Sequence, residues 1–216
     1  MAKEIAGRTS PGAEGLGVAV LGGSFNPPHR THQLLAAAAL AHLPITEVRI
    51  IPAGDHPHKR GTDMAPAADR LAMCQLAFAD QPHVVVDDRE VRRAGPSFTV
   101  DTLAELAASA PGRRIFFLIG SDNLPLLPTW RDHHRLLALC TVVTYPRAGH
   151  PVTAAALNGL DLTPTERDTL LTHVLALPAD AVAAADLRRR WRQGERLVPE
   201  LPLPVRTYIE AHALYG

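Results

Sequence analysis

Short apolar segments alternate along the chain with longer segments that carry apolar residues at helical spacing. The short segments, rich in β-branched residues, predict strands at residues 17–21, 47–53, 83–87, 114–120, 141–146 and 173–178. The segments between them predict helices at residues 32–43, 67–79, 99–109 and 131–139. Repeated alternation of this kind is typical of a three-layer α/β fold with a mostly parallel sheet. RIFFLIG, at 114–120, is of the kind buried on both faces of such a sheet.

From Ala183 onward the pattern changes, and a helical segment is predicted at the C-terminal end. ADLRRRWRQG has helix formers up to Gly194, a C-cap residue, and LPVRTYIEAHAL has the spacing of an amphipathic helix. Residues 1–16 lack periodicity and predict a disordered leader. With 46% hydrophobic content in 216 residues, the rest of the chain, 17–216, can bury a full core as a single domain.

Composition narrows the classes of partner and compartment. The 22 basic and 22 acidic residues cancel, which argues against a surface for nucleic acid or another polyanion. Cys74 and Cys140 each lie in an apolar stretch, so a disulfide framework is not expected and a reducing compartment is favoured. No window approaches the roughly 20 apolar residues that span a bilayer, and the N-terminus has no signal-peptide core. The sequence therefore predicts a cytoplasmic protein with no membrane partner.

The stretch LGGSFNPPHRTH joins the first predicted strand to the first predicted helix. Ligands of open parallel sheets collect at the carboxyl ends of the strands. Gly22 and Gly23 allow close approach of a ligand, and amides at the start of the helix favour an anion. His29 and His32 share one helix face and can offer two imidazole donors to phosphate. A glycine turn with two surface histidines is the alternative; metal binding by the pair is weaker, because no cysteine or carboxylate cluster joins them.

Several segments together resemble one enzyme family. GGSFNPPHRTH resembles the GGxFxPxHxGH signature of nucleotidylyltransferases with an HIGH-like motif. Further segments resemble, in order and spacing, those of the bacterial nicotinate mononucleotide adenylyltransferases: IPAGDHPHK, DRLAMCQLAF, REVRRAGPSFTVDTL, FFLIGSDNLPLLPTW and LPVRTYIEAHALYG. The resemblance covers about residues 17–150 and 173–216. It implies a Rossmann-like, doubly wound fold and Mg²⁺ with ATP. The implied reaction transfers AMP from ATP to nicotinate mononucleotide and releases pyrophosphate.

The resemblance also implies which residues bind ATP. His32, with His29 beside it, would contact the triphosphate and stabilise the departing pyrophosphate. The other implied ATP-binding residues are Gly22, Gly23, Ser24, Phe25, Gly120, Asp122 and Arg188. For Asp122 a role as helix N-cap is an alternative, and for Arg188 a place on a solvated basic helix face. Because the attacking phosphate is already ionised, positioning and charge neutralisation suffice without a general base. Magnesium would be held mainly by substrate phosphates, so no metal-ligating residues are predicted.

For the second substrate the resemblance implies a flat apolar surface. Trp130 would stack on the pyridine ring, and backbone amides near Phe98 and Thr99 would face the nicotinate carboxylate. Lys59 would bind phosphate. The alternatives are core packing for Trp130 and a solvated loop for Lys59.

Two departures from the family pattern keep other functions open. Thr31 replaces a glycine of the signature and could narrow the space for adenine or ribose, and Ala183–Ala185 replace hydroxyl residues before the basic helix. Each hydroxyl bond lost to a charged phosphate costs about 1.5–3 kcal/mol. The alternatives are a transferase of the same fold with another acceptor, such as nicotinamide mononucleotide, or a degenerate nucleotide-binding paralogue. The sequence gives neither the preference between the two mononucleotides nor the oligomeric state, so a homo-oligomer stays open.

Overall fold

A computed structural model describes residues 16–54, 64–178 and 181–216. The predicted disordered leader, apart from Leu16, lies outside these residues. Lys59 lies outside them as well. The single domain over residues 17–216 stays a prediction.

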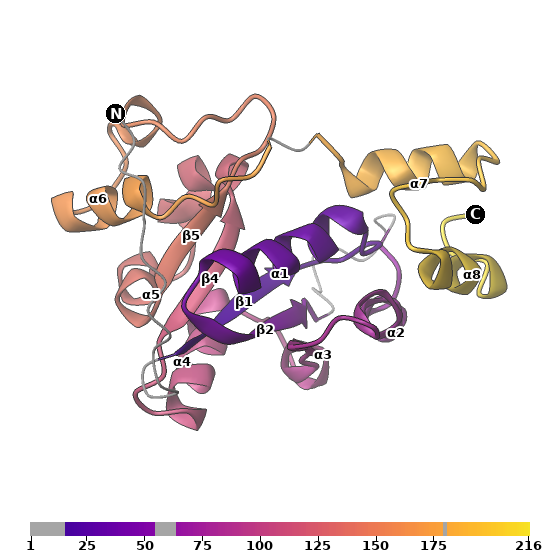
Figure 1. Cartoon of the computed structure of the whole chain (residues 1–216), viewed down its shortest axis with the longest axis horizontal. Helices are drawn as coiled ribbons and strands as arrows, with labels where there is room; N and C mark the ends of the chain where they lie inside the picture. The colour runs from indigo at the N-terminus through magenta and orange to yellow at the C-terminus, as the bar shows by residue number, and fades with distance from the viewer. Residues whose placement is uncertain (1–15, 55–63, 179–180) are drawn as a thin grey trace.

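Five strands of the described chain form one parallel sheet (Figure 1). Its strands are β1 (Gly17–Gly23), β2 (Ile45–Pro52), β3 (Val84–Val86), β4 (Ile115–Gly120) and β5 (Thr141–Tyr145). Their order is β3-β2-β1-β4-β5, and every neighbouring pair is parallel. The chain winds outward from β1 to β3 and then crosses back to β4. The direction of winding therefore reverses between β1 and β4, the switch point where doubly wound sheets bind ligands.

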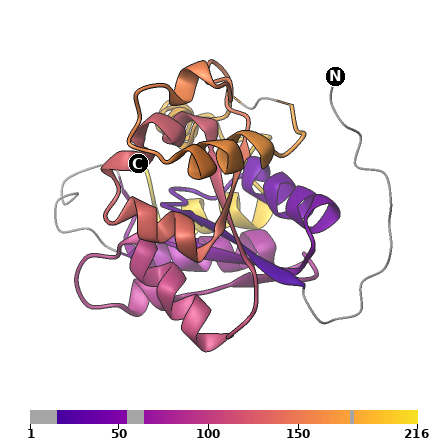
Figure 2. The same cartoon turned by 90° about the vertical axis from the view of Figure 1, so that its left-hand side faces the viewer.

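Helices cover both faces of the sheet, which confirms the α/β prediction (Figures 1 and 2). Helices α1 (Arg30–His42) and α2 (Ala67–Phe78) pack on one face. Helices α4 (Thr99–Ser109), α5 (His133–Leu139) and α6 (Pro164–Thr172) pack on the other. The remaining short helices are α3 (Arg89–Arg92) and the 3₁₀ segments η2 (Ser121–Thr129) and η3 (Ala155–Leu157).

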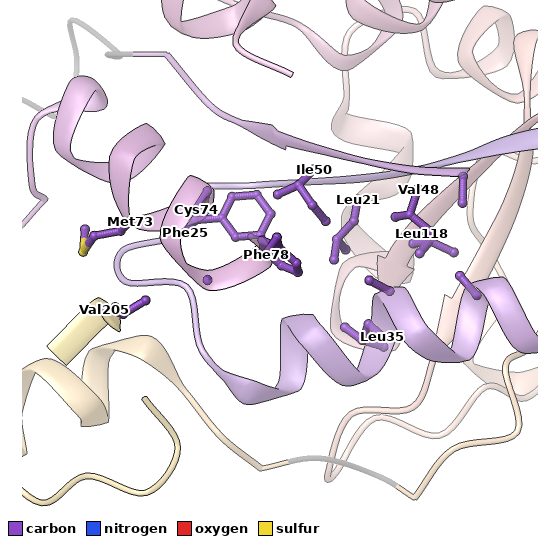
Figure 3. Packing of buried hydrophobic residues seen from close by; sticks show 14 of the residues in the cluster. Leu21, Phe25, Leu35, Val48, Ile50, Met73, Cys74, Phe78, Leu118 and Val205 are labelled. Carbon is purple, nitrogen blue, oxygen red and sulfur yellow. The ribbon is translucent and has the colours of Figure 1, made fainter. Parts of the chain in front are cut away.

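The two faces follow from the alternation of side chains along each strand. On β1, Ala19 and Leu21 belong to the core under α1 and α2, whereas Val18 and Val20 belong to the core under α4 and α5. Every residue of β4 is buried, as RIFFLIG predicted. Figure 3 shows the first core, where Leu21, Ile50 and Leu118 of the sheet meet the side chains of α1 and α2.

The predicted C-terminal helical segment is present as α7 (Ala184–Arg192) and α8 (Leu203–Ala211). Figure 1 shows both helices at one end of the molecule, where α8 contacts α2. Their apolar faces join the first core, and Figure 3 places Val205 of α8 near Met73 of α2. Gly194 has the left-handed φ of 88°, which suits the residue just past the end of α7.

The structure lacks one predicted strand and contains four short elements that were not predicted, namely α3, η2, η3 and α6. The strand expected at residues 173–178 is wrong: this segment makes a single bridge, between Val174 and Thr144, and Pro178 has no N–H to extend a ladder. Helix α6 was not expected, because only Leu170 of its nine residues is buried. It begins at a capping box formed by Thr163 and Glu166, a signal that the sequence does contain.

Candidate active site

A cavity of about 540 Å³ opens where β1 and β4 end, at the switch point of the sheet. It is lined from β1 and its following loop, from the residues after β4, and from the starts of α4 and α7. Ten of the predicted site residues line it: Gly22, Gly23, Ser24, Phe25, His29, His32, Thr99, Gly120, Asp122 and Trp130. The fold therefore brings together residues that are up to 108 positions apart in the sequence.

The floor of the cavity is backbone. Gly22 and Gly23 end β1 and are exposed. A Cβ at Gly22 would approach only the Phe117 ring, at 3.7 Å, and one at Gly23 only the Phe25 ring, at 3.5 Å. A side chain would therefore fit at either position. Because glycine has none, space is left open against the backbone. That space suits a close-lying ligand.

Phe25 turns the loop that follows. Its backbone has the left-handed φ of 45°, and its ring points into the first core beside Cys74 and Phe78 (Figure 3). A buried aromatic ring thus anchors the loop while the neighbouring Ser24 lines the cavity.

The two histidines of the loop lie against each other. Their ring centres are 3.9 Å apart, and the backbone N–H of His29 donates to Nδ1 of His32 at 3.1 Å. Since Nδ1 of His32 accepts this bond, its neutral ring carries the proton on Nε2. Burial lowers the pKa of His32 well below its ordinary value, and the charges of His29 and Arg147 lower it further. Before phosphate binds, His32 is therefore a neutral N–H donor.

The predicted anion site from amides at the start of α1 is wrong for the first two amides. The N–H of His29 is used by His32, and the N–H of Arg30 donates to the carbonyl of Glu200 at 2.8 Å. An anion in this cavity must instead rely on the loop before them and on side chains.

Arg147 is a cation of this cavity that the sequence analysis missed. It lies two residues past the end of β5, as Asp122 lies two residues past the end of β4, so the rule that places ligands at strand ends could have found it. Its guanidinium donates to the carbonyl of Val182 at 3.0 Å, and its Nε lies 4.0 Å from Oδ1 of Asp122. The second contact is a loose ion pair at the cavity wall.

Gly120 makes room for this pair. A Cβ there would lie 2.3 Å from Oδ1 of Asp122 and 3.1 Å from Cγ of Arg147. The alternative role of Asp122 as a helix N-cap is wrong, because Gly120 holds the N-cap position of η2 and Asp122 lies in its first turn.

Trp130 and Thr99 line the same cavity as the histidines but come from other elements. Trp130 follows η2 and lines the cavity, with its ring in an edge contact to Phe117 at 6.1 Å. Thr99 is the first residue of α4 and also lines it. The Phe98 side chain is 37% exposed, lies outside the lining, and carries the Arg131 guanidinium 4.5 Å from its ring centre.

The start of α7 closes a further side. Val182, Ala183 and Ala184 line the cavity, and the N-cap Ala183 has no side-chain cap. Arg188, one turn further on, does not line the cavity. It donates to the backbone carbonyl of Asn26 at 2.8 Å and so contacts the histidine loop from behind.

Arg70 of α2 holds the same loop from beneath and was also missed. It is fully buried, and its guanidinium donates to four backbone carbonyls, those of Ser24, Ala53, Gly54 and Ala65, at 2.7–3.3 Å. An arginine within the apolar DRLAMC segment was the signal for it. Arg70 fixes the exits of β1 and β2 relative to each other.

A second, mainly apolar cavity of about 380 Å³ adjoins the first. Thr31, Leu35, Tyr145 and Val182 line both. Leu34, Pro146, Leu177 and Pro199 contribute apolar walls. Thr31, where the family signature has glycine, thus stands at the boundary between the two.

Comparison with known proteins supplies the family. The model of the cytidylyltransferase-like family matches residues 20–192. A protein of Albidiferax ferrireducens named "Probable nicotinate-nucleotide adenylyltransferase" is 41% identical over 198 residues, which cover 92% of this chain and 97% of the relative. A protein of Symbiobacterium thermophilum with the same name is 41% identical over 199 residues, with coverage of 92% and 94%.

The fold matches solved structures as well. Plasmodium falciparum nicotinic acid mononucleotide adenylyltransferase complexed with NaAD superposes with a TM-score of 0.74 at 15% identity, covering 93% of this chain and 97% of that one. The same enzyme complexed with APC gives a TM-score of 0.68 at 14% identity, with the same coverage.

The family match, together with a sheet of this order and a histidine loop at its switch point, identifies a nucleotidyltransferase. The chain belongs to the cytidylyltransferase-like family and, within it, to the nicotinate-nucleotide adenylyltransferases, enzymes of NAD biosynthesis. The predicted resemblance is thereby confirmed. Nucleotidyltransferases of this kind use a divalent metal with ATP. In the described part of the chain, no helix has both the length and the hydropathy needed to span a bilayer.

Proposed function

We propose that this cavity transfers AMP from ATP to nicotinate mononucleotide, giving deamido-NAD and pyrophosphate. One observation carries the assignment of the site: a single cavity across β1 and β4 joins the histidine loop to Trp130 and the start of α4. A phosphate-binding end and an aromatic end are what a reaction between a triphosphate and a pyridine mononucleotide requires.

The triphosphate lies along Gly22–Phe25 in this proposal. His32 donates its Nε2–H to a phosphate oxygen, with His29 beside it. Because His32 is neutral before phosphate binds, the positive charge comes from Arg147, which also lines the cavity. Bound phosphate raises the pKa of His32 again, since a nearby opposite charge favours the protonated ring. Arg188 supports this end through Asn26.

The chemical step needs only alignment and charge neutralisation. A phosphate oxygen of nicotinate mononucleotide forms a bond to the α-phosphorus of ATP. The bond from that phosphorus to the bridging oxygen breaks, and pyrophosphate leaves with the electron pair. Donors fixed in advance stabilise the charge that develops on the leaving group. No side chain has to remove a proton, because the nucleophile is already an anion.

We propose Mg²⁺ as the divalent metal, held mainly by the phosphates. It usually takes one or two protein carboxylates and completes its shell with water and phosphate oxygens. Asp122 and Glu90 both line the cavity and offer that number of carboxylates. Asp122, next to Arg147, is the residue we assign to it. When bound, the metal neutralises phosphate charge.

The acceptor lies at the other end. Trp130 stacks on the pyridine ring, and backbone amides at Phe98 and Thr99, where α4 begins, meet the nicotinate carboxylate. Lys59, outside the described residues, stays a predicted phosphate contact. The adjoining apolar cavity suits the adenine ring, with Thr31 at its entrance. The cytoplasmic location stays a prediction.

A pyrophosphate-release assay with a panel of acceptors tests the function. With Mg²⁺ and ATP, we expect release to depend on added nicotinate mononucleotide. Preference for nicotinamide mononucleotide or another phosphate monoester would reassign the acceptor. ATP binding in a calorimeter without release from any acceptor would make the protein the nucleotide-binding paralogue instead.

A further inference from the structure

Asn26, in the middle of the histidine loop, ties together segments that are far apart in the sequence. It is 4% exposed and lines the cavity between Phe25 and His29. Its side-chain Oδ1 accepts from the backbone N–H of Ala65 at 3.0 Å and from the hydroxyl of Tyr215 at 2.7 Å. The loop is therefore fixed through a buried side-chain oxygen.

Tyr215 reaches this oxygen from the segment after α8. Ala213 and Tyr215 have φ of 48° and 62°, in the left-handed region that residues other than glycine seldom adopt. This backbone path carries the Tyr215 ring inward, against the core that holds Phe25 and Met73. Burial raises the pKa of the Tyr215 phenol, so the hydroxyl stays a donor at neutral pH.

The position of Asn26 bears directly on the groups that face the phosphates. Phe25 precedes it and sets the path from the glycine floor, and His29 follows three residues later and begins the pair with His32. A misplacement of about 1 Å at a reacting site can cost about a hundredfold in rate. Tyr215 itself does not line the cavity, so any effect it has on turnover must pass through Asn26.

We propose that Tyr215 is a positioning residue for the adenylyl transfer, which acts by holding Asn26 and, through it, the loop that carries His29 and His32. The proposal rests on the proposed function, because it takes the histidine loop as the ATP end of the cavity. Tyr215 contacts neither substrate. Its hydroxyl sets the shape of the ATP end and leaves the acceptor end unchanged.

A matched pair of variants isolates this role. Tyr215→Phe removes the hydroxyl that reaches Asn26. Tyr208→Phe removes a comparable hydroxyl from the same C-terminal segment, one that donates to Oδ1 of Asp69 at 2.8 Å and not to a residue of the loop. Loss of one buried hydrogen bond corresponds to about a three- to tenfold change. For Tyr215→Phe we expect kcat/KM for ATP to fall by about this factor while KM for nicotinate mononucleotide stays within about twofold. We expect Tyr208→Phe to stay within about twofold in both.

Urea unfolding of both variants supplies the folding control. Equal kinetic losses in the two variants, or an unchanged kcat/KM for ATP in Tyr215→Phe, would overturn the proposal. If the wild type releases no pyrophosphate with any acceptor, the proposed function fails and calorimetry decides the positioning claim. Tyr215→Phe must then bind ATP about three- to tenfold more weakly than Tyr208→Phe, and equal affinities would reject it.

Discussion

On the proposed ATP side of the cavity the loop after β1 is held by buried hydrogen bonds, whereas the proposed acceptor side is held by contacts near the surface. Arg70 and Asn26, both almost fully buried, fix the loop through backbone carbonyls and a side-chain amide. The acceptor side has the partly exposed Trp130, in edge contact with Phe117, and the exposed Phe98 under Arg131. Under the proposed function, the side where the phosphate bond breaks is therefore the more firmly held one, and the ring-binding surface is less constrained.

Removing the Arg70 clamp should have the largest effect. In Arg70→Met the apolar stem remains, but four buried carbonyls lose a charged donor. We expect the free energy of unfolding to fall by about 3–5 kcal/mol, as when a buried charge network is broken. Urea denaturation measures it.

Arg92→Met is the matched control, because the side chain of Arg92 is 74% exposed. It should change the free energy of unfolding by less than about 0.5 kcal/mol. A loss below about 1 kcal/mol for Arg70→Met would mean that the ATP side is not held more firmly than the acceptor side.

The next effect is on turnover. His32→Ala should lower kcat by at least about a hundredfold, because it removes a donor fixed in advance toward the departing pyrophosphate. Pyrophosphate release under saturating substrates measures it. His42→Ala, an exposed histidine at the end of the same helix, should turn over like the wild type. If His32→Ala released pyrophosphate at nearly the wild-type rate, His32 would have no role in the mechanism.

Trp130→Ala should give a smaller and more selective loss. Aromatic stacking contributes roughly 0.5–1.5 kcal/mol beyond area burial, so affinity for nicotinate mononucleotide should fall about two- to tenfold. Affinity for ATP should change little, and Trp130→Phe should recover part of the loss. If calorimetric titrations showed the same loss of affinity for both substrates, Trp130 would have only a packing role.

The smallest effect concerns the pH dependence of stability, whose sign differs between His134 and His32. On α5, the hydrogen bond with Glu166 raises the pKa of His134 from 6.5. The stability contributed by His134 is therefore present below pH 6.5 and lost as pH rises through the raised pKa. His32, whose pKa is lowered, acts oppositely: its neutral folded form loses stability as pH falls below 6.5.

Urea midpoints between about pH 5 and 9 test both signs. Glu166→Gln should flatten the decline above pH 6.5, and His32→Ala should flatten the decline below it. If both substitutions changed the slope of stability against pH in the same direction, the opposite pKa shifts of His134 and His32 would be contradicted.

The sequence predicted the sheet, most helices and most of the cavity because these depend on local periodicity and on one topological rule. Gly120 and Trp130 could be placed from their motifs, since strand ends meet at one edge of a parallel sheet. Arg70, Asn26 and Tyr215 could not be assigned roles, because their bonds join segments up to 189 positions apart. The use of the Arg30 amide by Glu200 is another such long-range pairing, and it removes that amide from the anion site expected at the start of α1.

A crystal structure of the protein with deamido-NAD tests the two-sided cavity most directly. The account predicts that the adenylate phosphate lies against Gly22–Phe25 within hydrogen-bonding distance of His32, and that the pyridine ring lies on Trp130. A pyridine ring seated at the histidine loop, or a product bound with Trp130 uncontacted, would contradict it.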